Sequence, residues 1–379
     1  LGLVGSEMCI RDRYLGGPVF RLRLVELPMP TGSRDPDVLL AWLLDSMGLV
    51  RRRVEGGTID EGQGALHRII SQAFLMEPLR GWDAKSLCEI TGISQTGVHH
   101  QLVKLRECGL ISAHTDGRWH VHVLRGGSIS SAVELVSNEA QTVLKIRMRE
   151  LSEKISESDE RMNVGSQNDE VKFKISISEP GPVNPEKSNM AILVEDLGLS
   201  GERAREGDGL ASGVMSILCE SSVPITILAL SERMGESRSR VSRSVEKMRA
   251  SGIVERVPMM DRIAQDIFVG LMRQFDARGE EWLMTRGGLG RIDEDISKKL
   301  VSGAKKGSLS IDKVRSLLGG IELESQKLLL NTLGGRMPYG FRISGRDGGE
   351  VSENVQRNAE RTLRRLNTVA QRLDEAIST

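Results

Sequence analysis

Cysteines, aromatic residues and long apolar runs are all scarce in this sequence, and each shortage argues against a class of protein. The four cysteines form no CxxC pair, which argues against a disulfide framework or a zinc ribbon and favours a reducing, cytoplasmic compartment. Aromatic residues make up only 3%, which disfavours a single-strand binder because such proteins stack bases on exposed rings. No apolar run approaches the ~20 residues that cross a bilayer, so we expect no membrane contact.

Net charge is also lacking, because 52 basic residues balance 52 acidic ones. This balance does not exclude nucleic acid as a partner, since binding depends on where the positive charge lies. The 379 residues contain no Walker loop, no dinucleotide fingerprint and no nucleophile–base arrangement. We therefore expect a protein that is not an enzyme and that has no cofactor and no metal site.

The first residues differ in character from the rest of the chain. The sequence begins with Leu1, and "SEMCIRDR" continues into the following residues with no turn or cap signal. It is neither a signal peptide nor a transit peptide in pattern. We expect residues 1–14 to be a non-native, adapter-derived segment and leave them out of the functional argument.

Composition and periodicity divide the remaining chain. "VFRLRLVEL" alternates as a strand does, and Asp35 and Pro36 begin a helix as N-cap and first residue. A stretch rich in Ser, Glu, Asp, Asn and Pro predicts a linker. The expected segments are a strand and helix extension (15–64), a first domain (65–127), a long amphipathic helix (128–155), a polar linker (156–187), a second domain (188–290), a helical region of unknown role (291–350) and a C-terminal amphipathic helix (351–379).

Two short segments resemble each other. "AWLLDSMGL" (41–49) is similar to "AILVEDLGL" (191–199), and each precedes a helix–turn–helix candidate by 40 to 50 residues. Repeats reveal the building unit of a fold. A diverged tandem duplication and coincidence both remain open.

The first helix–turn–helix candidate lies near residues 83–124. Gly92 permits a tight turn after a short helix, and Ser94 is placed to cap the next helix. Val98, Leu102 and Leu105 repeat at helical spacing and predict one buried face. After Gly109, two alternating segments flank Asp-Gly, which is a strong hairpin signal.

These residues carry a family resemblance. "SLCEITGISQTGVHHQLVKLRECGLI" with its hairpin resembles the winged helix–turn–helix of ArsR- and MarR-like transcription regulators, archaeal ones especially. The resemblance implies that the second helix enters the major groove of DNA. It makes candidate base or phosphate contacts of Ser94, Gln95, Thr96, His99 and His100, and phosphate contacts of Lys104 and the wing residue Arg118.

A second candidate follows the same pattern in "ITILALSERMGESRSRVSRSVEKMRASGIVERV" (225–257). Gly235 marks the turn and Ser237 the expected cap, and we expect Arg249 to point outward with its basic neighbours. Clustered cations on one helix are typical of phosphate binding. The DNA-binding candidates are Ser237, Arg238, Ser239, Arg240, Arg243 and Lys247. Residues 253–271 fit either a wing or a helix.

The sequence therefore predicts a mainly α fold with small β wings: tandem winged helix–turn–helix domains plus C-terminal helices. The expected function is a sequence-specific regulator of transcription that binds double-stranded DNA through helices 94–107 and 237–250. Two alternatives stay open. One is a non-catalytic winged-helix scaffold for protein contacts. The other is a metal- or ligand-gated sensor, suggested by a cluster of histidines in the first domain with two cysteines nearby: His99, His100, His114, His120 and His122, with Cys88 and Cys108.

Two helices carry apolar stripes suited to pairing. In 351–379, apolar residues recur at heptad spacing from Ala359 to Ile377. Helix 128–155 follows the first wing, where related regulators place a dimer helix. A homodimer through either helix, packing of the stripe within the chain, and a pseudo-dimer made by one chain with two winged domains are all compatible with this pattern.

Overall fold

The computed structural model describes residues 19–50, 64–116, 119–162, 171–182, 184–200 and 209–378. Over these residues the chain is mainly helical and has three two-stranded sheets, which confirms the predicted mainly α class with small β wings. No helix in the described ranges is long and apolar enough to span a membrane. Residues 1–14, expected to be adapter-derived, lie outside the described residues.

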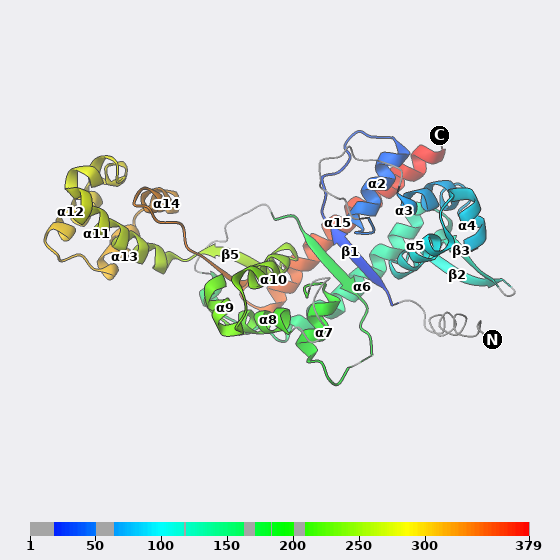
Figure 1. The fold of residues 1–379 in the computed structure, drawn as a ribbon, viewed down its shortest axis with the longest axis horizontal. Coiled ribbons are helices and arrows are strands. Elements are labelled where there is room, and N and C mark those ends of the chain that lie inside the picture. Colours follow the sequence, from blue (N-terminus) through cyan, green and yellow to red (C-terminus); the bar gives the residue numbers. More distant parts are fainter. Residues whose placement is uncertain are drawn as a thin grey trace, which may run out of the picture.

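The first half of the chain begins with a strand and ends with a long helix (Figure 1). Asp35 and Pro36 begin α2 as predicted, because the Asp37 N–H donates to Asp35 Oδ1 over 2.9 Å. The elements are β1 (Arg21–Val25), α2 (Pro36–Ser46), α3 (Ala65–Ile69) with the π-helical turn Ile70–Phe74, α4 (Ala84–Thr91), α5 (Gln95–Glu107), β2 (Ile111–Asp116), β3 (Trp119–Leu124), the 3-10 turn Arg125–Gly127 and α6 (Ile129–Ser152).

The second half repeats this order of elements. They are the 3-10 turn Asp159–Met162, β4 (Lys174–Ser178), α7 (Asn189–Asp196), α8 (Leu210–Glu220), α9 (Ile227–Met234), α10 (Arg238–Ala250), β5 (Val254–Pro258), β6 (Tyr339–Ile343) and α15 (Gly348–Ser378). A shift of 143 residues carries the bounds of α4 and α5 onto those of α9 and α10. A shift of 219 carries Trp119–Leu124 onto 338–343, and the N-cap Ser128 of α6 onto Asp347 at the start of α15.

The two shifts differ because a helical insertion separates β5 from β6. The insertion contains α11 (Met260–Thr285), the 3-10 turn Leu289–Arg291, α12 (Glu294–Lys305), α13 (Ile311–Leu318) and α14 (Leu323–Thr332). Its buried residues form a hydrophobic core separate from that of the rest of the chain. In Figure 1 it projects at the far left beyond β5.

This insertion explains residues that the sequence left ambiguous. Of 253–271, residues Val254–Pro258 are strand β5 and α11 begins at Met260. The partner of β5 is β6, which lies in 291–350, the region expected to be helical and of unknown role. The predicted second domain (188–290) did not include this partner, because nothing local marks a pairing across about 80 residues.

Strands β1 and β4 join the two halves. They pair antiparallel from Arg21 opposite Ser178 to Val25 opposite Lys174, and the ladder continues where the Glu26 N–H donates to Phe173 O over 2.8 Å. Strand β4 lies inside 156–187, the segment expected to be a linker. The linker boundaries stay a prediction, but this part of the segment is a partner of the N-terminal strand.

Helices α6 and α15 pack against each other in antiparallel fashion. At one end the Ser130 N–H donates to Asp374 Oδ2 over 3.0 Å, and at the other end Gly348 lies against the backbone of Ser152. The predicted heptad residues of α15 are buried from Ala359 to Leu373, while Ile377 is 36% exposed. Of the alternatives left open for these apolar stripes, the structure shows packing within the chain, since both stripes are buried against each other.

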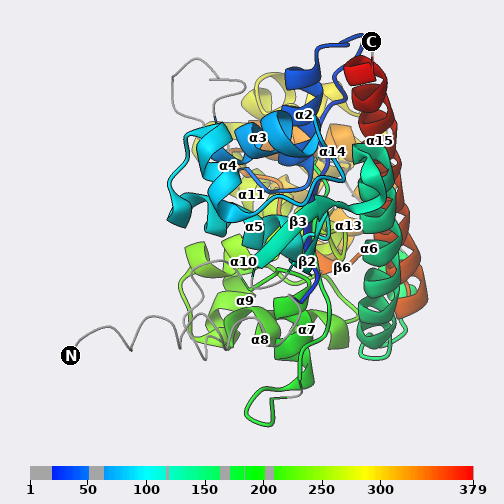
Figure 2. The same ribbon diagram turned by 90° about the vertical axis from the view of Figure 1, so that its right-hand side faces the viewer.

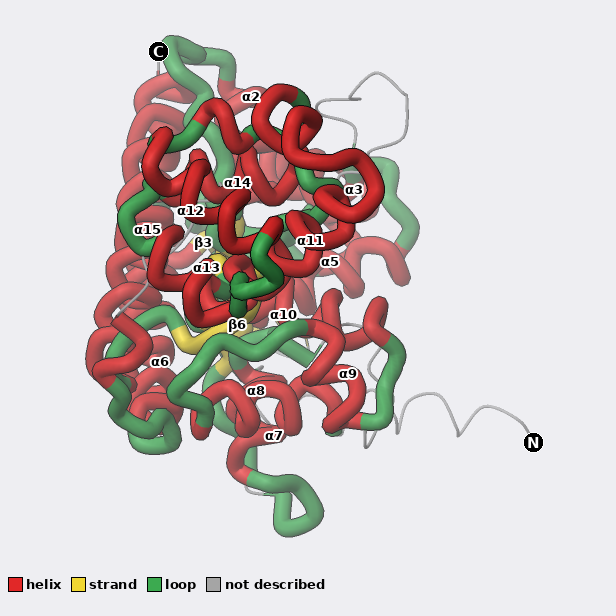
Figure 3. The backbone as a smooth tube through the Cα atoms, turned by 90° about the vertical axis from the view of Figure 1, so that its left-hand side faces the viewer, coloured by secondary structure: helices red, strands yellow, loops and turns green. Residues whose placement is uncertain are grey.

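The outer helices cross between the halves. Helix α2 packs on α15, and α7 packs on α6, where Arg147 of α6 donates to Asp196 of α7 over 3.1 Å. Figures 2 and 3 show α6 and α15 side by side along one edge of the molecule, with the remaining helices of both halves on the other side. Each half thus completes its packing with a helix of the other half.

A glycine after α7 tests how closely α7 approaches strand β4 of the same half. Gly198 has φ +69°, and an added Cβ would lie 2.5 Å from the Ser176 Cβ of strand β4. Gly32 has φ +77° but no atom within 4 Å of an added Cβ. We expect Gly32→Ala to lower the free energy of unfolding by about 1 kcal/mol through left-handed strain alone. Gly198→Ala adds a steric clash and should cost about 2–4 kcal/mol.

Urea denaturation followed by far-UV circular dichroism measures both variants. Equal midpoints for the two variants would contradict the close approach of Gly198 to β4.

Candidate nucleic-acid interface

Helices α4 and α5 form a helix–turn–helix whose caps follow from the sequence. The Ser86 N–H donates to Asp83 Oδ1 over 2.7 Å at the start of α4, and this hydrogen bond lowers the pKa of Asp83. Gly92 ends α4 with φ +67°, and the Gly97 N–H donates to Ser94 Oγ over 3.3 Å to cap α5. The predicted turn and the cap at Ser94 are confirmed.

Helix α5 buries one face and exposes its beginning. Val98, Leu102 and Leu105 are at most 2% exposed, so they hold the helix against the core as predicted. Lys104 is half-buried, with Nζ 3.5 Å from Gln101 Oε1. Five of the predicted contact residues are exposed at or near the first two turns: Ser94, Gln95, Thr96, His99 and His100.

Strands β2 and β3 form the expected hairpin beside α5. They pair from Ile111 opposite Leu124 to Asp116 opposite Trp119. The hairpin is fixed to the start of the domain because Trp82 and His122 exchange two backbone hydrogen bonds of 2.9 and 2.8 Å. The predicted wing contact Arg118 lies outside the described residues.

The histidines of the hairpin do not converge. His114 lies opposite Val121, so it is on the other face of the sheet from His120 and His122. His122 is buried, and its burial lowers its pKa to about 4. Among the described residues no group of three or more His, Cys, Asp or Glu is placed to hold a metal ion.

Helices α9 and α10 repeat the geometry of α4 and α5. Gly235 ends α9 with φ +64°, as predicted for the turn. Ser237 stands at the N-cap position of α10 but makes no capping bond; its Oγ lies 3.3 Å from Ser239 Oγ instead. The predicted cap at Ser237 is therefore wrong, because the hydroxyl turns to its neighbour.

The cations of α10 fall into two groups. Arg238 and Arg243 are exposed, whereas Arg240 and Lys247 are half-buried and Arg240 is 2.5 Å from Glu236 Oε1. Arg249, expected on the outward face, has a side chain only 8% exposed. It donates to Glu246 and lies over the Phe341 ring of β6, 6.0 Å from its centroid. The cationic face of α10 is therefore its first two turns.

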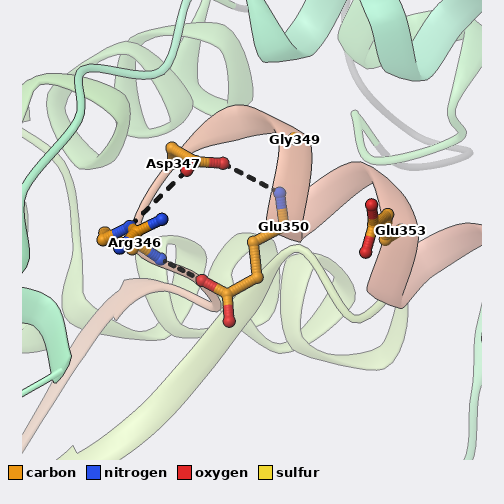
Figure 4. Close-up of a pocket in the computed structure, with 5 residues that line it drawn as sticks. All are labelled: Arg346, Asp347, Gly349, Glu350 and Glu353. Atoms are coloured by element: carbon orange, nitrogen blue, oxygen red, sulfur yellow. Dashed lines mark hydrogen bonds and ion pairs between the residues drawn. The ribbon is translucent and has the colours of Figure 1, made fainter.

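A pocket at the start of α15 has a structural explanation (Figure 4). Its lining includes Arg346, Asp347, Glu350 and Glu353. The Glu350 N–H donates to Asp347 Oδ1 over 2.9 Å, and the Arg346 N–H donates to Glu350 Oε2 over 2.7 Å. These bonds resemble the reciprocal bonds of a helix cap, so the carboxylates of Asp347 and Glu350 serve to stabilise the start of α15.

The buried His122 predicts a pH dependence of stability. Its folded pKa of about 4 lies below the ordinary value of 6.5, so between these pH values the unfolded chain binds a proton that the folded chain does not. The free energy of unfolding should therefore fall as pH drops from 6.5 towards 4, by at most on the order of 3 kcal/mol from this residue. His122→Gln should lose this part of the pH dependence.

Urea titrations at several pH values measure the effect, with the exposed His114→Gln as control. A pH profile of His122→Gln that parallels the unsubstituted protein would contradict a buried neutral imidazole.

Comparison with known proteins identifies the first helix–turn–helix. Residues 83–113 match the model of a family described as bacterial regulatory protein, arsR family. This range contains α4, the Gly92 turn, α5 and the beginning of β2. No curated protein and no solved structure is significantly similar to the chain. The chain thus carries an ArsR-type helix–turn–helix, which supports DNA binding and transcription regulation in general.

Proposed function

We propose that this protein regulates transcription by binding double-stranded DNA sequence-specifically, with α5 as a reading helix. The exposed beginning of α5 carries the proposal: Gln95, Thr96, His99 and His100 are free of the core, within the range that matches the ArsR family. In helix–turn–helix proteins the N-terminal residues of the second helix contact base edges in the major groove. A glutamine there can pair with adenine through two hydrogen bonds.

Residues around these readers supply phosphate contacts in this proposal. Ser94 offers a hydroxyl at the start of α5, and Lys104 and the predicted wing residue Arg118 offer positive charge. Such contacts fix the register of a protein on the duplex without reading sequence. Helix α5 carries few positive charges, which fits a helix that contributes more to sequence selectivity than to electrostatic affinity for DNA.

We further propose that α10 is a second DNA-binding helix, which supplies much of the affinity. Arg238, Arg240 and Arg243 lie in its first two turns with Ser237 and Ser239, and Lys247 follows one turn later. Cations that neutralise phosphates release counterions, so their contribution to binding depends strongly on salt. The geometry shared with α4 and α5 supports this role.

Salt dependence separates this function from a protein-contact scaffold. Binding to random-sequence duplex DNA, followed by fluorescence anisotropy, should weaken linearly in log Kd against log salt, with a slope of at least about 4 in magnitude. No binding at low salt would contradict the proposal and favour the scaffold.

Substitutions separate the contribution of α10 to affinity from the contribution of α5 to sequence preference. Arg238→Ala/Arg240→Ala/Arg243→Ala should weaken binding to all duplexes roughly 100-fold and reduce the salt slope by about 2–3. Gln95→Ala should change preference at one base pair by about 10- to 100-fold. Arg357→Ala/Arg364→Ala/Arg372→Ala removes the same formal charge from exposed or half-exposed positions of α15, outside both helix–turn–helix units, and should change neither quantity. An equal loss in this control would show that total charge, and not α10, determines affinity.

A further inference from the structure

The two halves are related by an approximate half-turn. In the β1–β4 ladder the residue numbers of every pair add up to the same value, and the shift of 153 that maps β1 onto β4 leaves this pairing unchanged. Any antiparallel pair of equal strands has this local twofold symmetry, so the remaining elements decide whether it extends to the two halves. Figure 1 is viewed close to this twofold axis: a half-turn of the picture brings α2 to α7, α4 to α9 and α5 to α10.

Contacts inside the first half recur at corresponding positions inside the second. Gly48 follows α2 and lies against Arg23 of β1, while Gly198 follows α7 and lies against Ser176 of β4. The shift that maps the strands also maps Arg23 onto Ser176. The bridge between Trp82 and His122 in the first half corresponds to a bridge between Ile225 and Phe341 in the second.

Both helix–turn–helix units lie on the same side of the paired helices α6 and α15. Figure 2 shows α4 and α5 above α9 and α10, all to the left, with α6 and α15 to the right. Figure 3, from the opposite end, places α6 and α15 at the left edge and α9 and α10 away from it. Two reading helices related by a twofold axis and placed on one face are the arrangement with which dimeric regulators bind two half-sites.

The two halves carry unlike readers. At corresponding positions, Gln95 is replaced by Arg238 and His100 by Arg243, whereas Val98 and the buried Val241 are the same. The hairpin tips also differ. Two residues, 117–118, connect β2 to β3, whereas 260–337 occupy the same place in the second hairpin, bounded by a hydrogen bond of 3.0 Å from Met259 N–H to Pro338 O.

From these observations we infer that one chain is a complete two-headed DNA reader. A single copy occupies a duplex site made of two unlike half-sites, one read by α5 and the other by α10. The inference rests on the proposed function. The stripes of α6 and α15, which would otherwise pair two chains, are buried against each other, so the second head comes from the same chain.

Selection from random-sequence duplexes tests this inference with the full chain. We expect two conserved blocks of unlike sequence at a fixed spacing, and one chain per duplex by native mass spectrometry. Inserting about 5 bp between the blocks turns one half-site to the other face of the duplex. Because the α6–α15 packing and the β1–β4 ladder hold the two helix–turn–helix units together, this insertion should weaken binding by at least about 100-fold.

Two double variants, one in α5 and one in α10, show which helix reads which block. Gln95→Ala/His100→Ala should erase sequence preference in one block, and Arg238→Ala/Arg243→Ala should erase it in the other. Replacing residues 260–337 by Gly-Arg, the pair found at 117–118, leaves the larger core intact because the insertion has its own core. This variant should still bind both blocks as one chain.

Three results would overturn the inference while leaving DNA binding in place: two chains per duplex, two identical inverted blocks, or affinity that does not respond to spacing. Loss of one block in the shortened variant would also overturn it, because the insertion would then hold a head. Failure to bind any duplex at low salt would overturn the proposed function together with the inference.

Discussion

The packing of α6 against α15 is the contact on which the rest of the molecule depends. Each helix is amphipathic and too long to be covered by its own half, so its apolar stripe needs a second long helix. Antiparallel packing satisfies both stripes at once and buries side chains such as Val136, Leu144, Leu363 and Leu366. Burial of this kind contributes roughly 1.5–3 kcal/mol per large apolar side chain. The packing of α6 against α15 therefore fixes the orientation of one half relative to the other.

Everything that crosses between the halves follows from that orientation. Once α6 and α15 are antiparallel, α2 can reach α15 and α7 can reach α6, and β1 meets β4 edge to edge. Ion pairs reinforce the exchange, since Glu26 beside β1 accepts from Arg365 of α15 over 2.8 Å. This pair is partly buried and links β1 to α15, but a single ion pair of this kind contributes little beside the apolar surface buried around it.

Local chemistry was readable in the sequence and long-range pairing was not. Asp35, Gly92, Ser94 and Gly109 act within four residues of their own position, so a cap or a left-handed turn can be recognised from neighbours alone. The partner of β5 lies about 80 residues away, and the covering of the α15 stripe depends on a helix 200 residues earlier. Arg249 shows the same limit on the candidate site, because only the later strand β6 brings Phe341 beneath its guanidinium.

The α6–α15 contact also explains why the two helix–turn–helix units can differ in sequence. In a symmetric homodimer, a substitution in one reading helix appears in both, and an insertion at one hairpin tip appears twice. When both heads belong to one chain, each position changes once. Helix α10 can then carry arginines where α5 has Gln95 and His100, and the second hairpin can hold an insertion with its own core where two residues separate β2 from β3. The residues of the α6–α15 contact must therefore stay complementary, whereas the helix–turn–helix units and hairpins that this contact holds in place can differ between the two halves.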